Sequence, residues 1–171
     1  MKLKRSIVIF PQLGKDTNLI QNIRHKHDPL ASKIAPHITL VFPFESEISS
    51  NALRQHIETQ LDGLKSFGLS FQGVSQEENN YLFLNIIKGR EKIVKIHNLL
   101  YQGILNRFLS QRHQYKPHLT IGRCNDISTA QTAMKELKSF DRQLKTQVDK
   151  ISTEIILEDS VSKVDFTVEL T

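Results

Sequence analysis

Cysteine, glycine, proline and long apolar runs are all scarce in this chain of 171 residues. Its single cysteine, Cys124, cannot form an internal disulfide, which favours a reducing cytoplasm. No apolar run approaches the roughly 18 residues that a membrane-spanning helix needs. The basic start is followed by only a short apolar stretch, 7–10, and by no small-residue cleavage site, which argues against a signal peptide. We therefore expect a cytoplasmic protein without a membrane partner.

The composition is typical of a soluble globular protein, with 39% apolar and 24% charged residues. The length fits one ordinary domain or two small lobes that share a core. No low-complexity segment or obvious linker divides the chain, so we expect one body. The formal net charge of +5 and the pI of about 9.4 mildly favour an anionic partner, but they do not by themselves indicate nucleic acid.

Short β-branched segments alternate with segments at helical spacing, which predicts alternating strands and helices. The expected strands cover residues 6–11, 36–42, 66–74, 81–88, 117–122, 148–157 and 164–170. The expected helices run from Asp16 to His27, from the serine pair Ser49 and Ser50 to about Leu61, over 90–109, and from Ser128 to about Leu137, with the first-named polar residues as N-caps. The order strand, helix, strand, helix, strand occurs twice. This predicts two structural repeats, about 6–78 and 79–171, in a single α+β domain.

The two repeats carry the same motif in their second strand. Pro36-His37-Ile38-Thr39-Leu40 matches Pro117-His118-Leu119-Thr120-Ile121, 81 residues later (118 − 37). Because side chains alternate between the faces of a strand, each histidine shares a face with the threonine two positions on, while the apolar neighbours point into the core. If a pseudo-twofold axis relates the halves, both polar faces line one cleft.

Two imidazoles and two hydroxyls in one cleft suit in-line displacement at phosphorus. One neutral imidazole takes a proton from the attacking hydroxyl or water, and an imidazolium on the opposite side protonates the leaving oxygen. Histidine serves both roles because its unperturbed pKa of about 6.5 leaves both forms populated near neutrality. The threonine hydroxyls can donate to non-bridging oxygens, and no metal is required. A single histidine in a strand is more often a core residue, but the repetition of Pro, His and Thr argues against that interpretation.

The stretches "HDPLASKIAPHITLVFPF" and "KPHLTIGR" resemble the 2H phosphoesterase superfamily, especially small bacterial members of its 2′-5′ RNA ligase and cyclic phosphodiesterase branch. The resemblance implies a duplicated bilobal fold: two antiparallel sheets with helices outside and a central cleft between lobes related by a pseudo-twofold axis. It implies His37 and His118 as the acid–base pair and Thr39 and Thr120 as phosphate-binding hydroxyls. The implied substrates are 2′,3′-cyclic phosphates, 2′-5′ linkages or related nucleotides, generally without a metal or other cofactor.

Three residues near the second motif are candidates for substrate binding. Arg123 could hold a phosphate, although strict alternation puts it on the face opposite His118 unless Gly122 permits a β-bulge. Tyr115 and Lys116 precede the motif and could stand at the mouth of the cleft, where an aromatic ring can stack on a base. Packing of the tyrosine on its own lobe is the alternative.

The remaining candidates are expected to be structural. Phe42 and Phe44 are expected to fill the core, and His25 and His27 to form a solvated basic helix end rather than a metal site. His56, His97 and His113 are expected at the surface or the edge of the core, and Cys124 as a buried, inert thiol.

The sequence therefore predicts a metal-independent phosphoesterase whose substrate is an RNA end or a small cyclic nucleotide. Two alternatives stay open. One is an RNA 2′-5′ ligase, which is the same displacement run backwards. The other is a non-catalytic RNA- or nucleotide-binding module that retains the cleft. The substrate, the oligomeric state and the identity of the acid among the two histidines are not fixed by the sequence.

Overall fold

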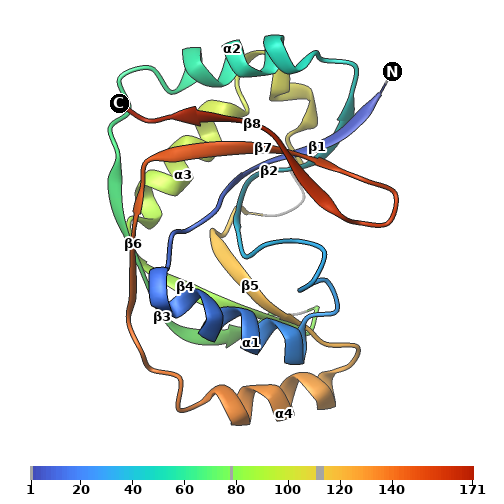
Figure 1. The fold of residues 1–171 in the computed structure, drawn as a ribbon, viewed down its shortest axis with the longest axis vertical. Coiled ribbons are helices and arrows are strands. Elements are labelled where there is room, and N and C mark those ends of the chain that lie inside the picture. The colour runs from blue at the N-terminus through green and yellow to red at the C-terminus, as the bar shows by residue number, and fades with distance from the viewer. Residues whose placement is uncertain (1, 78, 111–113) are drawn as a thin grey trace.

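The structure is a computed structural model that describes residues 2–77, 79–110 and 114–171. Its strands are β1 (Leu3–Ile9), β2 (Ile38–Ser46), β3 (Phe67–Gln76), β4 (Tyr81–Lys88), β5 (His118–Arg123), β6 (Leu144–Val148), β7 (Lys150–Ile156) and β8 (Ser162–Glu169). Its α-helices are α1 (Thr17–His27), α2 (Ser50–Gln60), α3 (Arg90–Leu100) and α4 (Ile127–Leu137), and 3-10 turns cover Gly14–Asp16 and Gly103–Phe108. The α+β class is confirmed (Figure 1).

The strands form two antiparallel halves that meet in the middle. The strand order is β6-β3-β4-β5-β2-β1-β7-β8, and every pairing in it is antiparallel. The central pairing, between β5 and β2, consists of one residue pair, Ile38 with Leu119. The two expected sheets are therefore present as two four-stranded halves joined at a single point.

Each half of the sheet contains strands from both halves of the sequence. Strand β3 follows α2 in the chain but pairs with β4 and β6, whereas β7 and β8 from the end of the chain extend the half that holds β1 and β2. The helices exchange as well: α1 packs on β5, and α3 packs on β2 (Figure 1). Helices α2 and α4 cover β8 and β3, at opposite ends of the molecule. This exchange binds the two lobes into one body.

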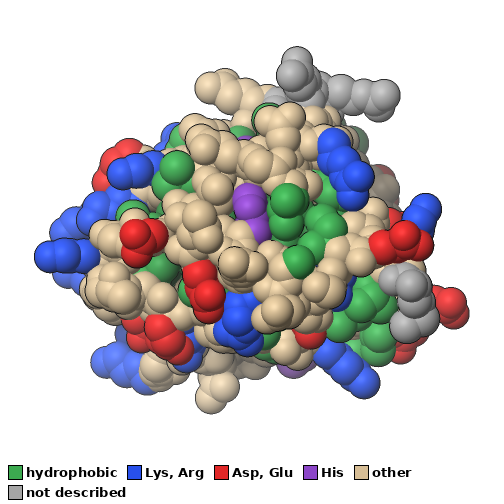
Figure 2. All heavy atoms as spheres, turned by 90° about the horizontal axis from the view of Figure 1, so that it is seen from above, with side chains coloured by type: hydrophobic (Ala, Val, Ile, Leu, Met, Phe, Trp, Pro, Cys, Tyr) green, Lys and Arg blue, Asp and Glu red, His purple; other side chains and the backbone are tan. Residues whose placement is uncertain are grey.

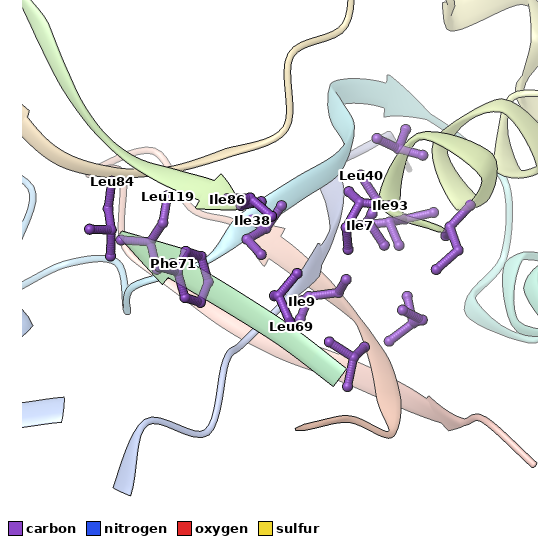
Figure 3. Packing of buried hydrophobic residues seen from close by; sticks show 14 of the residues in the cluster. Ile7, Ile9, Ile38, Leu40, Leu69, Phe71, Leu84, Ile86, Ile93 and Leu119 are labelled. Carbon is purple, nitrogen blue, oxygen red and sulfur yellow. The ribbon is translucent and has the colours of Figure 1, made fainter. Parts of the chain in front are cut away.

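A single cluster of buried apolar side chains runs through both halves of the sheet. Figure 3 shows Ile7, Ile9, Ile38 and Leu40 from one half together with Leu69, Phe71, Leu84, Ile86 and Leu119 from the other, and Ile93 from α3. These side chains are almost completely removed from solvent. Because burial of apolar surface is the dominant stabilising term, the shared core holds the two motif-bearing strands in a fixed relation.

Several local expectations differ from the structure at element ends. Ser49 caps α2 as expected, accepting from the amide of Ala52 at 3.2 Å. Asp16 precedes α1 without a side-chain capping bond, and its carboxylate instead pairs with Arg142 at 2.7 Å. The cap of α4 is Asp126 rather than Ser128, because the Asp126 carboxylate accepts from the amide of Thr129 at 2.7 Å. N-caps therefore depend on backbone geometry that the sequence alone leaves open.

Two expected elements are divided. The helix predicted over 90–109 ends at Leu100, because Gln102 is extended, with a ψ of 171°, and Gly103 takes a positive φ of 54°. A separate 3-10 turn follows over Gly103–Phe108. The strand predicted over 148–157 is preceded by a separate strand, β6, that runs along β3. In the described part of the chain, no helix is long and apolar enough to cross a membrane. His113 lies outside the described residues.

We expect the Gly89→Ala variant to lose more stability than Gly63→Ala. Both glycines have positive φ, of 85° and 70°, so an alanine at either position costs about 1–2 kcal/mol of backbone strain. At Gly89 the added Cβ also lies 2.7 Å from the Gly68 carbonyl oxygen, whereas nothing lies within 4 Å at Gly63. Urea unfolding measures both free energies. Equal losses would show that the β3 backbone relaxes around the contact without cost.

Candidate functional site

The proposed motif strands enclose a cavity where they separate. Strands β2 and β5 share only the pair Ile38 with Leu119. Beyond it they diverge around a cavity of about 320 Å³. The cavity is lined by Ser6, Ile34, His37, Thr39, Phe42, Pro43, Tyr81, His118, Thr120, Arg123, Glu154 and Ile156. All four motif side chains line it, while Ile38 and Leu119 are fully buried, as alternation predicts.

Each motif strand has one extra residue immediately after its threonine. In β2, Thr39 pairs with Val8 of β1 and Val41 with Ile7, so Leu40 is the extra residue. In β5, Thr120 pairs with Phe83 of β4 and Gly122 with Leu82, so Ile121 is the extra residue. An extra residue of this kind is a β-bulge, which reverses the face of the side chains that follow it, up to the next irregularity. In β2 a second register shift follows between Val41 and Phe44. The two bulges occupy equivalent places in the two repeats.

The bulges bring Phe42 and Arg123 onto the face of the histidines. Each follows its motif histidine by five positions (42 − 37 and 123 − 118). The β-bulge considered for β5 is present, and Arg123 lines the cavity on the same face as His118. The expectation that Phe42 fills the core is wrong: the residue is 46% exposed and lines the cavity. Phe44 is buried as expected.

The two histidines are oriented in the same way by their own backbones. His37 Nδ1 lies 2.8 Å from the carbonyl oxygen of Ala35, and His118 Nδ1 lies 2.6 Å from that of Lys116. A carbonyl oxygen only accepts, so each Nδ1 donates, and in the neutral ring Nε2 is then the unprotonated nitrogen. In the described part of the chain, neither Nε2 has a hydrogen-bond partner. Both are thus available to a molecule in the cavity.

The rings differ in what packs against them. Phe83 stacks on His118 with ring centres 3.4 Å apart, whereas Phe10 meets His37 edge-on at 6.3 Å. Burial lowers the pKa of His118 to about 4, against smaller raising effects of the Lys116 carbonyl and the Glu77 charge. Burial also lowers the pKa of His37, opposed by the Ala35 carbonyl and by the charge of Glu154. Without a bound anion, both imidazoles favour the neutral form.

A buried ion network holds Arg123 in the wall of the cavity. Its Nη1 donates to Asp28 Oδ1 at 2.5 Å. The other carboxylate oxygen, Asp28 Oδ2, accepts from Arg24 Nε at 3.3 Å and Nη2 at 3.1 Å. Arg24 and Asp28 are both almost fully buried. One carboxylate therefore compensates two guanidinium groups, which leaves a net positive charge beside the histidines.

Tyr115 and Lys116 do not line the cavity, contrary to the expected place at its mouth. The Tyr115 hydroxyl donates to the carbonyl of Thr39 at 2.7 Å, and its ring stacks on His97 with centres 3.6 Å apart. Lys116 Nζ binds Glu77 at 2.5 Å. Tyr115 thus packs behind β2, in the alternative role considered for it, because its hydroxyl finds a partner on the edge of that strand.

Glu154, Ser6 and Tyr81 line the cavity but carry no signal in the sequence motifs. Glu154 lies on β7, far from both motifs along the chain, and its carboxylate accepts from the hydroxyls of Ser6, at 2.7 Å, and Ser162. A negative charge in the site was not expected, since neither motif contains a carboxylate. The alternating pattern of a strand does not reveal which other strands pair beside it.

The other candidate residues take structural positions. His56 and His97 are buried and bind the carbonyl oxygens of Leu100 and Leu40, at 2.9 Å and 2.7 Å. His25 is exposed at the end of α1, and His27 lies 3.4 Å from Glu136. Cys124 is half-buried, and burial raises the pKa of its thiol. Among the described residues, no group of three or more His, Cys, Asp or Glu is arranged to hold a metal ion.

The excess of basic residues is distributed rather than concentrated on the face drawn in Figure 2. There, Lys and Arg side chains occur together with Asp and Glu side chains, with histidine and hydrophobic atoms between them. A continuous basic stripe is the usual footprint of a protein that binds long nucleic acids through their phosphates. On this face the charge pattern gives no such footprint.

A duplicated antiparallel fold with two histidines and two threonines around one cavity defines a two-histidine, phosphoesterase-like protein. The sequence profile described as the 2′-5′ RNA ligase superfamily matches residues 10–157, so the chain belongs to this family. A Bacillus mycoides protein named "Putative phosphoesterase" is 31% identical over 140 residues, covering 77% of this chain and 74% of its own. A Bacillus licheniformis protein with the same description is 25% identical over 151 residues, covering 86% and 87%.

Solved structures share the fold at low sequence identity. Escherichia coli LigT in complex with 3′-AMP superposes with a TM-score of 0.69 at 14% identity, covering 100% of this chain and 99% of its own. TT0787 of Thermus thermophilus superposes with a TM-score of 0.68 at 13% identity, covering 98% of both chains. These matches confirm the duplicated fold expected from the motifs.

We expect Asp28→Asn to destabilise the protein by about 3–5 kcal/mol, because it leaves two guanidinium groups without their buried counter-charge. Lys26→Gln is the control: Lys26 lies in α1 two positions before Asp28, and its ion pair with Glu136 of α4 is exposed and contributes little. Urea unfolding at pH 7 compares the two variants. If both lose the same stability, the network does not hold the site together.

Proposed function

We propose that the protein is a metal-independent phosphoesterase that acts on 2′,3′-cyclic phosphate or 2′-5′ phosphodiester groups of RNA ends or small nucleotides. His37 and His118 are the acid–base pair, and Thr39, Thr120 and Arg123 bind the phosphate. The observation that carries the proposal is the pair of unengaged Nε2 atoms lining one cavity together with two hydroxyls and a guanidinium. Family membership and the names of the curated relatives support it.

The geometry supports a reaction at a single phosphorus atom. The strand pair Ile38 with Leu119 places His37 and His118 on opposite sides of one axis, each next to the threonine of the other strand. A phosphate between them has one imidazole on the side of the attacking oxygen and one on the side of the leaving oxygen, as in-line displacement requires. Hydroxyl and guanidinium donors can stabilise the charge that develops on the non-bridging oxygens.

The aromatic lining supports a nucleotide as the substrate. Phe42 exposes its ring at the edge of the cavity, and a base can stack on an exposed aromatic face irrespective of its sequence. The same position in the other repeat is Arg123, so one side of the site offers a ring and the other a charge. Structures of the Escherichia coli neighbour hold 3′-AMP and ATP, which is consistent with a nucleotide here.

A substrate screen tests the proposal. Cyclic 2′,3′-mononucleotides, oligoribonucleotides with cyclic ends and 2′-5′-linked dimers are incubated with the protein, and the products are identified by mass spectrometry. Release of a 2′- or 3′-phosphate supports the phosphoesterase. A joined 2′-5′ linkage would instead identify the ligase direction. Measurable RNA affinity without turnover would identify a binding module.

We expect His37→Ala and His118→Ala each to lower turnover by roughly 10²- to 10⁴-fold, because each removes a proton-transfer group. The double variant should lose much less than the product of the two, since the histidines act as one unit. Thr39→Val and Thr120→Val keep the shape of the strand and should lose less. Steady-state kinetics measure these changes, with and without excess chelator, which should make no difference.

Thermal unfolding of the same variants provides the control. The four side chains face the cavity rather than the core, so their removal should leave the melting temperature nearly unchanged. If His37→Ala keeps its turnover but melts at a lower temperature, the histidine is structural and the acid–base assignment is wrong.

A further inference from the structure

A second cavity adjoins the cavity that holds His37 and His118, and Phe42 lines both of them. The second cavity measures about 510 Å³, against about 320 Å³ for the first. It is called the α3 cavity here, because His97 and Asn98 of α3 lie in its wall, and the first is called the histidine cavity. The wall of the α3 cavity includes Phe42, His97, Asn98, Leu109, Gln114 and Tyr115.

The α3 cavity continues the opening between the two motif strands. Strands β2 and β5 pair only at Ile38 with Leu119, so the residues before β5 pass along β2 without forming a ladder. The Tyr115 hydroxyl donates to the Thr39 carbonyl at 2.7 Å, and the rings of Tyr115 and Phe42 meet edge-on with centres 6.2 Å apart. Helix α3 packs on β2 and closes the far side (Figure 1). The same separation of strands therefore produces both cavities.

The floor of the α3 cavity is aromatic and fixed in place. The rings of Tyr115 and His97 stack with their centres 3.6 Å apart and their planes within 3° of parallel. His97 is buried, and its Nδ1 lies 2.7 Å from the Leu40 carbonyl oxygen. Both rings are thus held by the backbone of β2. Together with the half-exposed side chains of Phe42 and Leu109, they offer a preformed surface to a flat apolar group.

The rim of the α3 cavity carries amide groups and no counter-charge for a phosphate. Asn98 and Gln114 are exposed, and within the part of the chain that the structure describes neither side chain has a hydrogen-bond partner. An amide offers both donors and an acceptor, and Asn and Gln pair with the edges of nucleobases, of adenine in particular. No Lys, Arg, Asp or Glu is found among the described lining residues. A nucleobase, with flat faces and a polar edge, matches both floor and rim.

The opposite end of the histidine cavity offers a poorer site. A cavity of about 260 Å³ adjoins it there, and Arg123 lines both. Its charged groups are already paired, Arg123 with Asp28 at 2.5 Å and Lys26 with Glu136 at 2.7 Å. Its volume also falls below the range of about 300–1,000 Å³ that is usual for pockets of small ligands, whereas the α3 cavity lies within that range. An additional group of the substrate is therefore better placed beside α3.

We propose that the α3 cavity binds the base of the nucleotide next to the one that bears the reacting phosphate. The preferred substrate is then the end of an RNA, or an oligonucleotide of at least two nucleotides, rather than a mononucleotide. The inference rests on the proposed function and names the substrate class within it. The histidine cavity lies at the lower end of the usual volume range, so a longer substrate needs space beyond it, and Phe42 marks where that space begins.

Three substrates with the same reacting group test the proposal on the wild-type protein. They are adenosine 2′,3′-cyclic phosphate, the adenine dinucleotide with a 2′,3′-cyclic phosphate end, and the same dinucleotide without its upstream base. The intact dinucleotide should have a kcat/KM at least about tenfold above that of the mononucleotide, because stacking of a base on aromatic rings contributes that much to affinity. The abasic dinucleotide should fall back close to the mononucleotide. If it keeps the gain, the sugar or the second phosphate is recognised and the proposal is wrong.

Two variants of the rim locate the effect. Asn98→Ala and Gln114→Ala should each lower kcat/KM for the intact dinucleotide by about 2- to 10-fold, the effect of one lost hydrogen bond. Turnover of the mononucleotide should stay unchanged, because neither residue lines the histidine cavity. The matched control is Asn125→Ala, which removes an exposed amide from the cavity at the opposite end and should change neither substrate. If neither rim variant separates the dinucleotide from the mononucleotide, the proposal is overturned.

Binding measurements keep this proposal separate from the proposed function. Calorimetry compares adenosine 3′-phosphate with the adenine dinucleotide 3′-phosphate, and the dinucleotide should bind at least about tenfold more tightly. If no substrate is turned over, the proposed function fails and this comparison alone decides whether the α3 cavity binds a base. If mononucleotide and dinucleotide are turned over equally well, the proposed function stands and the α3 proposal fails. The abasic comparison needs no variant, so it decides even if a substitution prevents folding.

Discussion

The site depends on one constraint: the two halves of the sheet join through the single residue pair Ile38 with Leu119. A longer ladder between β2 and β5 would close the space in which the cavity lies, because neighbouring paired strands are only about 5 Å apart. No pairing at all would leave the two histidines unrelated in space. One pair fixes their relative position and lets the strands separate immediately beyond it.

Beyond the pair of Ile38 with Leu119, backbone groups at the edge of β2 have no neighbouring strand to form hydrogen bonds with. Side chains form these hydrogen bonds instead. The Thr39 carbonyl accepts from Tyr115 at 2.7 Å, the Leu40 carbonyl from His97 at 2.7 Å, and the Phe42 amide donates to Tyr101 at 3.0 Å. Unpaired buried backbone groups are costly, so these contacts stabilise the open edge. Tyr115, which was a site candidate in the sequence, and His97 thus stabilise the strand that carries His37 and Thr39.

Duplication gives the molecule approximate symmetry, and side chains at equivalent positions break it. The equivalent positions Phe42 and Arg123 offer a ring and a charge to the cavity. Glu154 lines the cavity as well, whereas Glu77 pairs with Lys116. Glu154 reaches the cavity on β7, a strand from the other half of the chain than β1 and β2. Each lobe therefore receives part of its environment from the other half of the chain.

The sequence by itself determined the α+β class, the repeated order of elements and the equivalence of the two motifs. Those features follow from local periodicity, and alternation correctly placed His37 and Thr39 opposite Ile38. Only the tertiary structure decided that β3 and β7 change lobes, that Phe42 turns outward and that Glu154 enters the cavity. Strand partners and bulges depend on contacts between residues distant in the chain, and a bulge at Leu40 reverses the alternation without any glycine to signal it.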